Sequence, residues 1–355
     1  MNMQNSHDWW VGGIVLLMAW FLSLLLTGAV RRYAVRRALW DIPNERSSHT
    51  VPTPRGGGLA IAAILALGVA TLGFSGIVQL KVMWALLGGG ALVAGIGWMD
   101  DHRHVAPHWR VSVHALAALW AVYCLGGLAK ITVGGDAWHI GWLGSVLAVI
   151  GIVWLINLYN FMDGIDGLAG VEAVTAGLSG AALFWWAGLP GLGLAAALIA
   201  ASSAGFLGWN WPPAKIFMGD VGSGLLGYCF AVLALAGEKS GQVPAALWLV
   251  LVAVFVLDAT FTLISRVLAG ERWYTAHRSH AYQRTAQLGY SHRRGSLTVG
   301  LINRRRRVPV AALALSYPAT LPWSVGMIAV AGWATWKAAQ NRYRDYHTGK
   351  ITDKQ

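Results

Sequence analysis

Carboxylates are scarce in this chain of 355 residues, and five of its fifteen Asp and Glu residues fall at the ends of apolar segments. Mg²⁺ prefers oxygen ligands, and it commonly takes one or two carboxylates from a protein and the rest from water or substrate phosphates. Adjacent carboxylates repel each other, and a nearby cation relieves that repulsion. The pattern indicates a divalent-cation site, with solvated or capped helix ends as the alternative, at Asp100, Asp101, Asp163, Asp166 and Asp220.

Four polar residues recur every three positions in one segment: Asn157, Asn160, Asp163 and Asp166. Such a row drifts slowly around a helix with 3.6 residues per turn, so that neighbouring members share a face. Gly164 and Gly167 follow the two acids. We interpret the row as a frayed helix end that lines a polar cavity. Capping of the helix by Asn and Asp is the alternative.

Asp220 stands where a helix is expected to begin, between Gly219 and Gly222. An acid at this position is favourable simply as an N-cap, which is the alternative to a chemical role. The glycines, however, let backbone N–H groups approach an anion closely. The segment therefore indicates a carboxylate next to an anion-binding backbone.

Basic and histidine residues supply candidate contacts to an anionic substrate. His277 and His280 are spaced to share a helix face, and with Arg278 they are interpreted as contacts to a diphosphate rather than as exposed loop residues. An oxygen-rich site prefers Mg²⁺ or Mn²⁺, so metal ligation by these histidines is disfavoured. Asp258 lies about 10 Å inside an apolar span, and acids in such positions are functional candidates. Further substrate-binding candidates are Asn160, His49, Arg55 and Lys215. The candidate catalytic acids are Asp100, Asp101, Asp163 and Asp166.

The composition is that of a membrane protein, because 56% of the residues are hydrophobic and only 12% are charged. A soluble domain carries roughly twice that charged fraction, and a spanning helix needs about 20 apolar residues. The sequence predicts an all-α polytopic membrane bundle, in one domain over residues 1–336, with apolar spans near 9–30, 57–74, 82–98, 111–128, 142–159, 168–186, 190–208, 221–236, 243–265 and 308–336.

The basic residues predict the orientation of this bundle. With the N-terminus outside, the inside connections hold 19 Lys and Arg and the outside connections hold three, and positive residues mark the cytosolic side. The five acids then lie at cytosolic helix ends. A basic cytosolic loop is expected over 266–307 and a basic tail over 337–355. If the tail is cytosolic, Pro318 and Pro322 divide the last apolar region into a hairpin, and 11 membrane helices are expected. If that region is a single span, the tail lies outside and 10 membrane helices are expected.

Taken together and in this order, the motifs resemble those of the polyprenyl-phosphate N-acetylhexosamine-1-phosphate transferases. The similarity extends from about residue 31 to residue 295. It is carried by Pro52-Thr53-Pro54 with Gly56-Gly57-Gly58, Asp100-Asp101, Asn157 through Gly167, Phe217 through Ser223, and the histidines at 277 and 280.

The resemblance implies roles for the candidate residues. Asp220 would be a Mg²⁺ ligand, with Asn157 and Asp163 close to the metal and Mn²⁺ as a substitute ion. Asp100 and Asp101 would match the catalytic pair that activates the lipid phosphate. The implied substrates are a UDP-amino sugar and undecaprenyl phosphate, at the bacterial inner membrane among its lipids. No nucleic-acid partner is expected, and a homodimer is left open.

Departures from one branch narrow the resemblance. The peptidoglycan branch has three consecutive histidines, where this chain has His277-Arg278-Ser279-His280, and a Lys where it has His49-Thr50-Val51. These departures argue against a phospho-muramoyl-pentapeptide transferase. The runs at 44–49 and 276–283 look most like those of the O-antigen-initiating branch. An ion-coupled transporter is a rival from another class, but it would need acids near the membrane midplane. A CDP-alcohol phosphotransferase would need a different Asp-Gly pattern, which is incomplete here.

Overall fold

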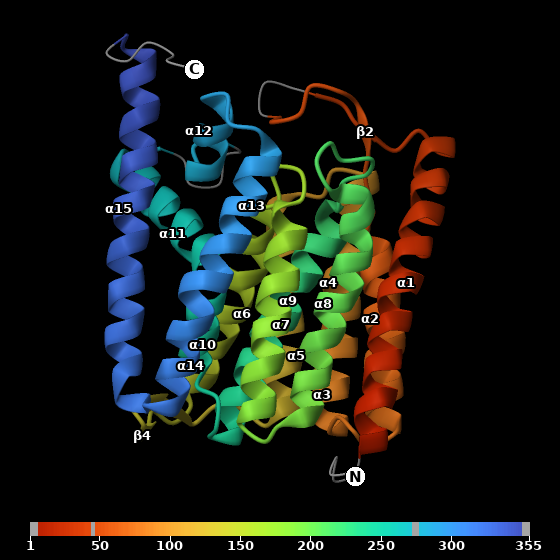
Figure 1. The fold of residues 1–355 in the computed structure, drawn as a ribbon, viewed down its shortest axis with the longest axis vertical. Coiled ribbons are helices and arrows are strands. Elements are labelled where there is room, and N and C mark those ends of the chain that lie inside the picture. Colours follow the sequence, from red (N-terminus) through yellow and green to blue (C-terminus); the bar gives the residue numbers. More distant parts are fainter. Residues whose placement is uncertain (1–5, 44–46, 272–276, 350–355) are drawn as a thin grey trace.

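The computed structural model describes residues 6–43, 47–271 and 277–349, with the side chains of 6–11 left out, and these residues form an upright bundle of helices (Figure 1). The long helices of the first half are α1 (Ser6–Arg36), α2 (Gly58–Phe74), α3 to α4 (Leu80–Trp84 and Gly90–His102, joined by the π-helical turn Ala85–Gly89), α5 (Pro107–Leu125) and α6 (Leu143–Phe161). The helices of the second half, long and short, are α7 (Leu168–Trp186), α8 (Pro190–Asn210), α9 (Gly219–Ser240), α10 (Ala245–Leu251), α11 (Ala253–Leu268), α12 (Ala281–Gln287), α13 (His292–Ile302), α14 (Val308–Ser316) and α15 (Leu321–His347).

Two short antiparallel hairpins are the only strands in the described residues. In one, β1 (Trp40–Asp41) pairs with β2 (Thr53–Pro54), with Trp40 opposite Pro54. In the other, β3 (Lys130–Val133) pairs with β4 (Asp136–His139). The two hairpins lie at opposite ends of the bundle (Figure 1), and β2 lies at the end that holds the candidate site.

The expected class, an all-α polytopic membrane bundle, is confirmed. Within the described residues, six helices are long and apolar enough to cross a membrane, and a seventh span results if α10 and α11, which meet at 85°, are counted as one. The shorter helix α2 is also apolar. The number of crossings, expected to be 10 or 11, stays a prediction, as does the periplasmic N-terminus.

The C-terminal region differs from the expected basic loop over 266–307. Residues 292–316 form one continuous helix in which α13 passes through a π-helical turn at Asn303–Arg307 into α14. The chain then turns at Pro318–Thr320 into α15. The hairpin expected at the two prolines is therefore present in the described residues, and its arms are longer than their apolar segments because the helices continue through Arg-rich sequence. The end of α15 lies at the end of the bundle opposite to the start of α1 (Figure 1).

A buried polar network joins α7 to the Arg-rich turn. Asn303 Nδ2 donates to Glu172 Oε2 at 2.6 Å and lies 2.7 Å from Thr175 Oγ1, while Arg307 Nη1 donates to Asn303 Oδ1 at 2.9 Å. Glu172 is fully buried and Arg307 is 7% exposed. A buried carboxylate without a compensating charge is costly, so Arg307 accounts for the presence of an acid inside α7.

We expect Glu172→Ala to destabilise the protein by about 3 kcal/mol, because it leaves Arg307 buried without its acidic partner. Thermal unfolding of the purified protein in detergent measures the change. The control is Asp136→Ala, whose side chain is exposed in the short strand β4. Equal melting temperatures for the two variants would contradict a structural role for Glu172.

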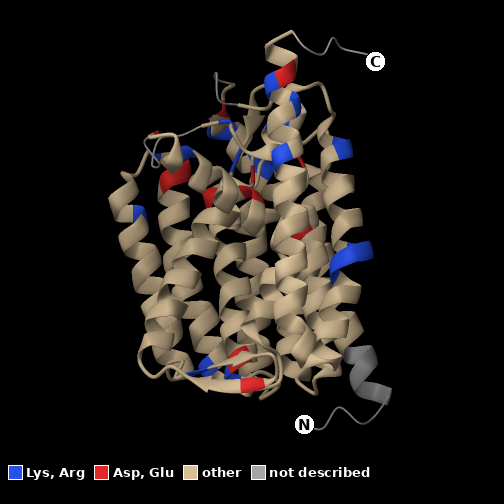
Figure 2. Cartoon of the chain, turned by 90° about the vertical axis from the view of Figure 1, so that its left-hand side faces the viewer, with Lys and Arg blue, Asp and Glu red and all other residues tan. Residues whose placement is uncertain are grey.

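Small residues bring three helices together beneath the candidate site. Gly227 of α9 packs against Leu155, Ile156 and Tyr159 of α6, and Gly224 packs against Val93 of α4 and Ile156 of α6. Tyr159, Phe230 and Phe255 fill the core between them, with the rings of Tyr159 and Phe255 4.9 Å apart. Acids and bases collect mainly at the two ends of the bundle (Figure 2). The packing thus fixes the ends of α4, α6 and α9 relative to one another.

Candidate active site

The end of α4 meets the start of α9 through Asp101. Its carboxylate accepts hydrogen bonds from the backbone N–H groups of Asp220, at 3.1 Å, and Val221, at 3.4 Å. These N–H groups have no partner within their own helix, and an acid at this position also interacts favourably with the helix dipole. Asp101, rather than Asp220, therefore caps α9, and the Asp220 side chain is left available for another role.

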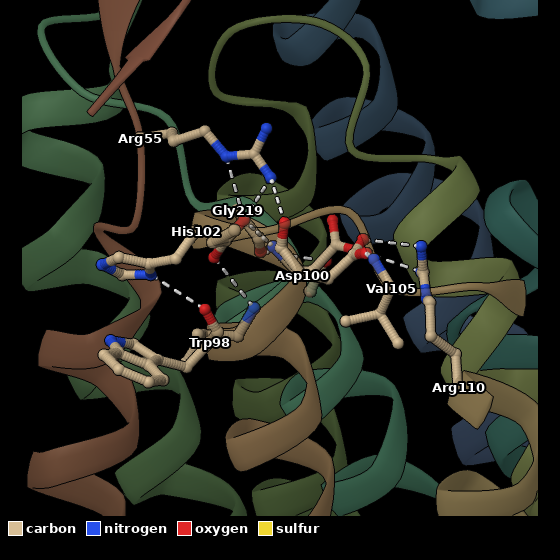
Figure 3. A network of polar contacts seen from close by, with 11 residues as sticks. Arg55, Trp98, Asp100, His102, Val105, Arg110 and Gly219 are labelled. Atoms are coloured by element: carbon tan, nitrogen blue, oxygen red, sulfur yellow. Dashed lines mark hydrogen bonds and ion pairs between the residues drawn. The ribbon is translucent and has the colours of Figure 1, made fainter. Parts of the chain in front are cut away.

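Arg55 holds Asp101 from the other side. Its guanidinium donates to Asp101 Oδ1 from Nε, at 3.1 Å, and from Nη2, at 2.8 Å (Figure 3). Although burial opposes it, the carboxylate of Asp101 raises the pKa of Arg55 above its usual value. The Asp101 side chain is only 2% exposed, and it is committed to this contact and to the α9 cap.

Backbone pairing fixes the loop that carries Arg55. The N–H of Phe217 donates to the carbonyl of Pro54 at 2.8 Å, and the N–H groups of Gly57 and Gly58 donate to the carbonyls of Phe217, at 2.9 Å, and Met218, at 2.8 Å. The segment before α2 and the segment before α9 are thus joined. The two glycine-containing motifs, remote in sequence, place Arg55 and Asp220 at the same site.

Arg110 joins the other two carboxylates, and it was missing from the residues selected on sequence. Its Nη1 lies 2.8 Å from Asp100 Oδ2 and its Nη2 lies 2.9 Å from Asp220 Oδ2. Asp100 also accepts the backbone N–H of Val105 at 2.7 Å. In the sequence Arg110 is simply one of two basic residues after Asp101. The one sequence feature that could have pointed to Arg110 is Pro107, three residues earlier. Pro107 begins α5 and so places Arg110 in the first turn of that helix.

These side chains surround an open cavity of about 460 Å³. Arg55 and Arg110 lie on opposite sides of the acids, as Figure 3 shows. The lining combines anion-binding and cation-binding groups, which suits a charged substrate together with a metal ion. It consists of Arg55, Asp100, Asp101, His102, Arg103, His104, Arg110, Asn160, Phe161 and Asp220.

Asp163 follows α6 and has an unpaired carboxylate. It makes no side-chain hydrogen bond or ion pair with the described part of the chain. Burial, and then the negative charges of Asp220, Asp101 and Asp166, raise the pKa of Asp163 well above its usual range. A cation would relieve this repulsion, so the donor set fits Mg²⁺.

The described residues contain no ready cluster of three or more His, Cys, Asp or Glu side chains around a common metal position. A Mg²⁺ ion at this site would therefore have to take most of its ligands from substrate phosphates and water. Asn157, the third candidate ligand, lies within α6 and donates to the carbonyl of Val153 at 2.7 Å. Its amide oxygen, not its nitrogen, would have to face a metal.

Asp166 is held apart from the other acids. Its Oδ2 accepts the backbone N–H of Ala214 at 3.0 Å, and its Oδ1 lies 3.3 Å from Nδ1 of His292. Although burial opposes it, the hydrogen bonds of His292 and Ala214 hold the pKa of Asp166 below its usual value. These contacts join the start of α13 to the loop before α9, and the catalytic role expected for Asp166 stays a prediction.

The histidine motif is anchored by Asp258. The carboxylate of Asp258 accepts the backbone N–H groups of Ala281, at 2.8 Å, and Tyr282, at 3.2 Å, and it lies 3.6 Å from Nδ1 of His280. Tyr282 in turn donates its hydroxyl to the carbonyl of Phe161 at 3.0 Å. Asp258, selected as a substrate contact, therefore holds the motif against the end of α6.

His277 lies 4.9 Å from His280, ring to ring, and its Nδ1 is 2.8 Å from the Ser279 hydroxyl. Burial, and then the positive charges near it, lower the pKa of His277 to about 4. At neutral pH this ring is therefore uncharged, and it can offer a hydrogen bond but no positive charge. Arg278 donates to the carbonyl of Ser47 at 3.0 Å, which ties the histidine loop to the segment that carries His49.

Two further candidates have their own partners. The ring of His49 packs edge-on against Phe217 at 4.8 Å, and its Nε2 lies 3.4 Å from the carbonyl oxygen of Asp41. The ammonium of Lys215 lies over the ring of Trp209, 5.7 Å from its centroid. Neither residue lines the cavity described above, whereas Asn160 does.

The backbone of Gly97 in α4 lies close to the backbone of Asp220, and this contact fixes the position of Asp220 at the start of α9. A Cβ placed on Gly97 would lie 2.6 Å from the backbone carbonyl carbon of Asp220. We expect Gly97→Ala to move the start of α9 and to lower activity about 10²-fold, since displacements of this order can cost that much. Gly95→Ala is the control on the same helix, because a Cβ there meets nothing within 4 Å. Equal turnover in the two variants would contradict this dependence.

Known proteins resemble this chain over most of its length. Residues 83–238 match the model of glycosyl transferase family 4. A probable undecaprenyl-phosphate N-acetylglucosaminyl 1-phosphate transferase of Bacillus subtilis is 32% identical, over 81% of this chain and 82% of that protein. A decaprenyl-phosphate N-acetylglucosaminephosphotransferase of Mycobacterium tuberculosis is 32% identical, over 94% and 90%. A phospho-N-acetylmuramoyl-pentapeptide-transferase of Mycobacterium sp. is 42% identical but over only 22% and 20%.

The Mycobacterium tuberculosis protein matches 94% of this chain, and the family match includes the ends of α4 and α6 and the start of α9. Identity at this level over more than two thirds of each relative reflects common descent. The chain belongs to the polyprenyl-phosphate N-acetylhexosamine-1-phosphate transferases of glycosyl transferase family 4.

Proposed function

We propose that this phosphosugar transferase moves an N-acetylated amino-sugar 1-phosphate from a UDP-sugar to undecaprenyl phosphate, with release of UMP and with Mg²⁺ at Asp220 and Asp163. The observation that carries the proposal is the convergence of Asp100, Asp220 and two arginines on one open cavity. The charges of Asp220 and Asp101 reach the unpaired Asp163, because after burial they raise its pKa. Bound Mg²⁺ would supply neutralisation of the negative charge on the diphosphate.

The residues of the chain then divide the work of phosphoryl transfer, in which positioning and electrostatic stabilisation dominate. A lipid phosphate oxygen forms a bond to the sugar-bearing phosphorus, and the bond from that phosphorus to UMP breaks. Arg55 and Arg110 reduce the repulsion between the two anionic substrates. Asp101 is fully committed to Arg55 and the α9 cap. We therefore assign to Asp100 the task of keeping the lipid phosphate deprotonated and in position.

The direct test is release of UMP by the purified protein in detergent. The reaction contains undecaprenyl phosphate, Mg²⁺ and one UDP-amino sugar at a time. Lipid-dependent UMP release that is lost on addition of a chelator, and that Mn²⁺ restores at least in part, is the expected result. A transporter, the rival from another class, would release no UMP.

The same assay, run with a panel of UDP-amino sugars, identifies the donor sugar. The first two relatives are both named for N-acetylglucosamine, so UDP-N-acetylglucosamine is the first donor to try, followed by 6-deoxy amino sugars. Initiation of an O-antigen-type polysaccharide at the inner membrane remains part of the proposal. The peptidoglycan alternative predicts turnover of a UDP-muramoyl-pentapeptide, which the short similarity to that enzyme supports less well.

A further inference from the structure

A second cavity, of about 410 Å³, lies at the same end of the bundle but apart from the active site. It is formed by the end of α11, by α12 and by the last turns of α15, and it shares no lining residue with the aspartate cavity. The positively charged residues in its lining are Arg284, Lys337 and Arg344, and they are joined there by Gln340 and Asn341.

One buried nitrogen of Arg284 lacks a partner at this cavity, and Arg344 is held only loosely. Nε of Arg284 is buried and has no hydrogen-bond partner in the described residues. Its guanidinium carbon lies 4.8 Å from the centroid of the Tyr343 ring, which holds the group at the cavity. Arg344 has only a loose contact of 3.7 Å with Asp345. An arginine whose donors are withheld from water needs an acceptor, and phosphate oxygens are suitable acceptors.

The position along α15 indicates where such an acceptor comes from. Trp336 and Tyr343 lie about 22 and 33 Å from Leu321 at 1.5 Å per residue, and the hydrocarbon core of a bilayer is about 30 Å thick. Aromatic residues flanked by basic ones at this height are typical of the membrane–water boundary. Lys337, Gln340 or Asn341, and Arg344 recur every three or four positions and so share a face of α15.

We propose that this cavity, named here the α15 pocket, binds the phosphate headgroup of an anionic membrane phospholipid. Basic pockets between membrane helices on the cytosolic side bind such headgroups. The occupant would lie next to the histidine loop, because Gln340 donates to the carbonyl of Ser279 at 2.9 Å and Trp336 donates to Thr262, which donates to Asp258.

Native mass spectrometry of the full chain, titrated with phosphatidylglycerol or phosphatidylcholine, tests the proposal. We expect Arg344→Gln and Arg284→Gln each to weaken phosphatidylglycerol binding about fivefold, which is the effect of one basic charge near a lipid surface. The matched control is Arg342→Gln. Arg342 is two residues from Arg344, but it lies over the ring of Tyr290 and does not line the pocket. It is expected to bind as the unchanged protein does.

Equal phosphatidylglycerol binding by all three variants would overturn the proposal. So would displacement of the lipid by millimolar inorganic phosphate, because the pocket would then serve free phosphate. Arg344 is exposed, so its variant is expected to fold, and its melting temperature checks this. The binding readout requires no transfer activity, so its failure is distinguishable from failure of the proposed reaction.

Discussion

Asp220→Asn is expected to reduce UMP release at least about 10³-fold, even at saturating Mg²⁺, because it removes the negative charge proposed to hold the metal at the diphosphate. The change is close to isosteric. It leaves the start of α9 intact, since Asp101 rather than Asp220 accepts the first N–H groups of that helix. A loss of activity can then be attributed to chemistry and not to unfolding. Initial rates across a Mg²⁺ titration provide the measurement.

Asp136→Asn serves as the control for Asp220→Asn. Asp136 is an exposed acid in β4, at the far end of the bundle. It should retain full turnover, and both variants should melt near the temperature of the unchanged protein. Full turnover by Asp220→Asn at saturating Mg²⁺ would exclude Asp220 as a metal ligand and would leave Asp163 as the candidate.

The spacing of the motifs predicted which acids lie at the site, but it did not predict which contacts each acid makes there. Asp100, Asp101 and Asp220 were expected at one membrane face because apolar spans end there, and the helix ends do meet. Which carboxylate caps α9 depends on the angle at which α4 approaches it, and that angle is set by Gly97 against the backbone of Asp220. Contacts between elements of this kind leave no periodic signal in a single sequence.

Basic residues were harder to interpret than acids. Ten arginines between 266 and 307 predicted a loop, yet Arg307 lies buried in a helix because Asn303 and Glu172 compensate its charge. Hydropathy counts such residues as polar whatever their partners are. An acid in an apolar helix suggested substrate binding by Asp258, which stays a prediction. The sequence did not reveal that its carboxylate accepts backbone N–H groups of the histidine motif.

Arg110→Gln is expected to lower turnover about 10²-fold, the usual cost of losing one preorganised electrostatic group. In the structure this guanidinium bridges the carboxylates of Asp100 and Asp220, with one N–H group directed at each. Arg110→Lys should restore only part of the rate, because an ammonium is a point charge and cannot reproduce the planar fork that reaches both acids. Steady-state kinetics of UMP release measure both variants.

The Mg²⁺ dependence of the Arg110 variant separates catalysis from simple structural support. Arg110 competes with a metal ion for the carboxylate of Asp220, so its removal should lower the Mg²⁺ concentration that gives half-maximal activity while the maximal rate falls. Arg103→Gln is the matched control, since Arg103 lines the same cavity and makes no ion pair with a described acid. A variant that merely loosened the site would need more Mg²⁺, not less, and a raised requirement would therefore place Arg110 among the structural residues.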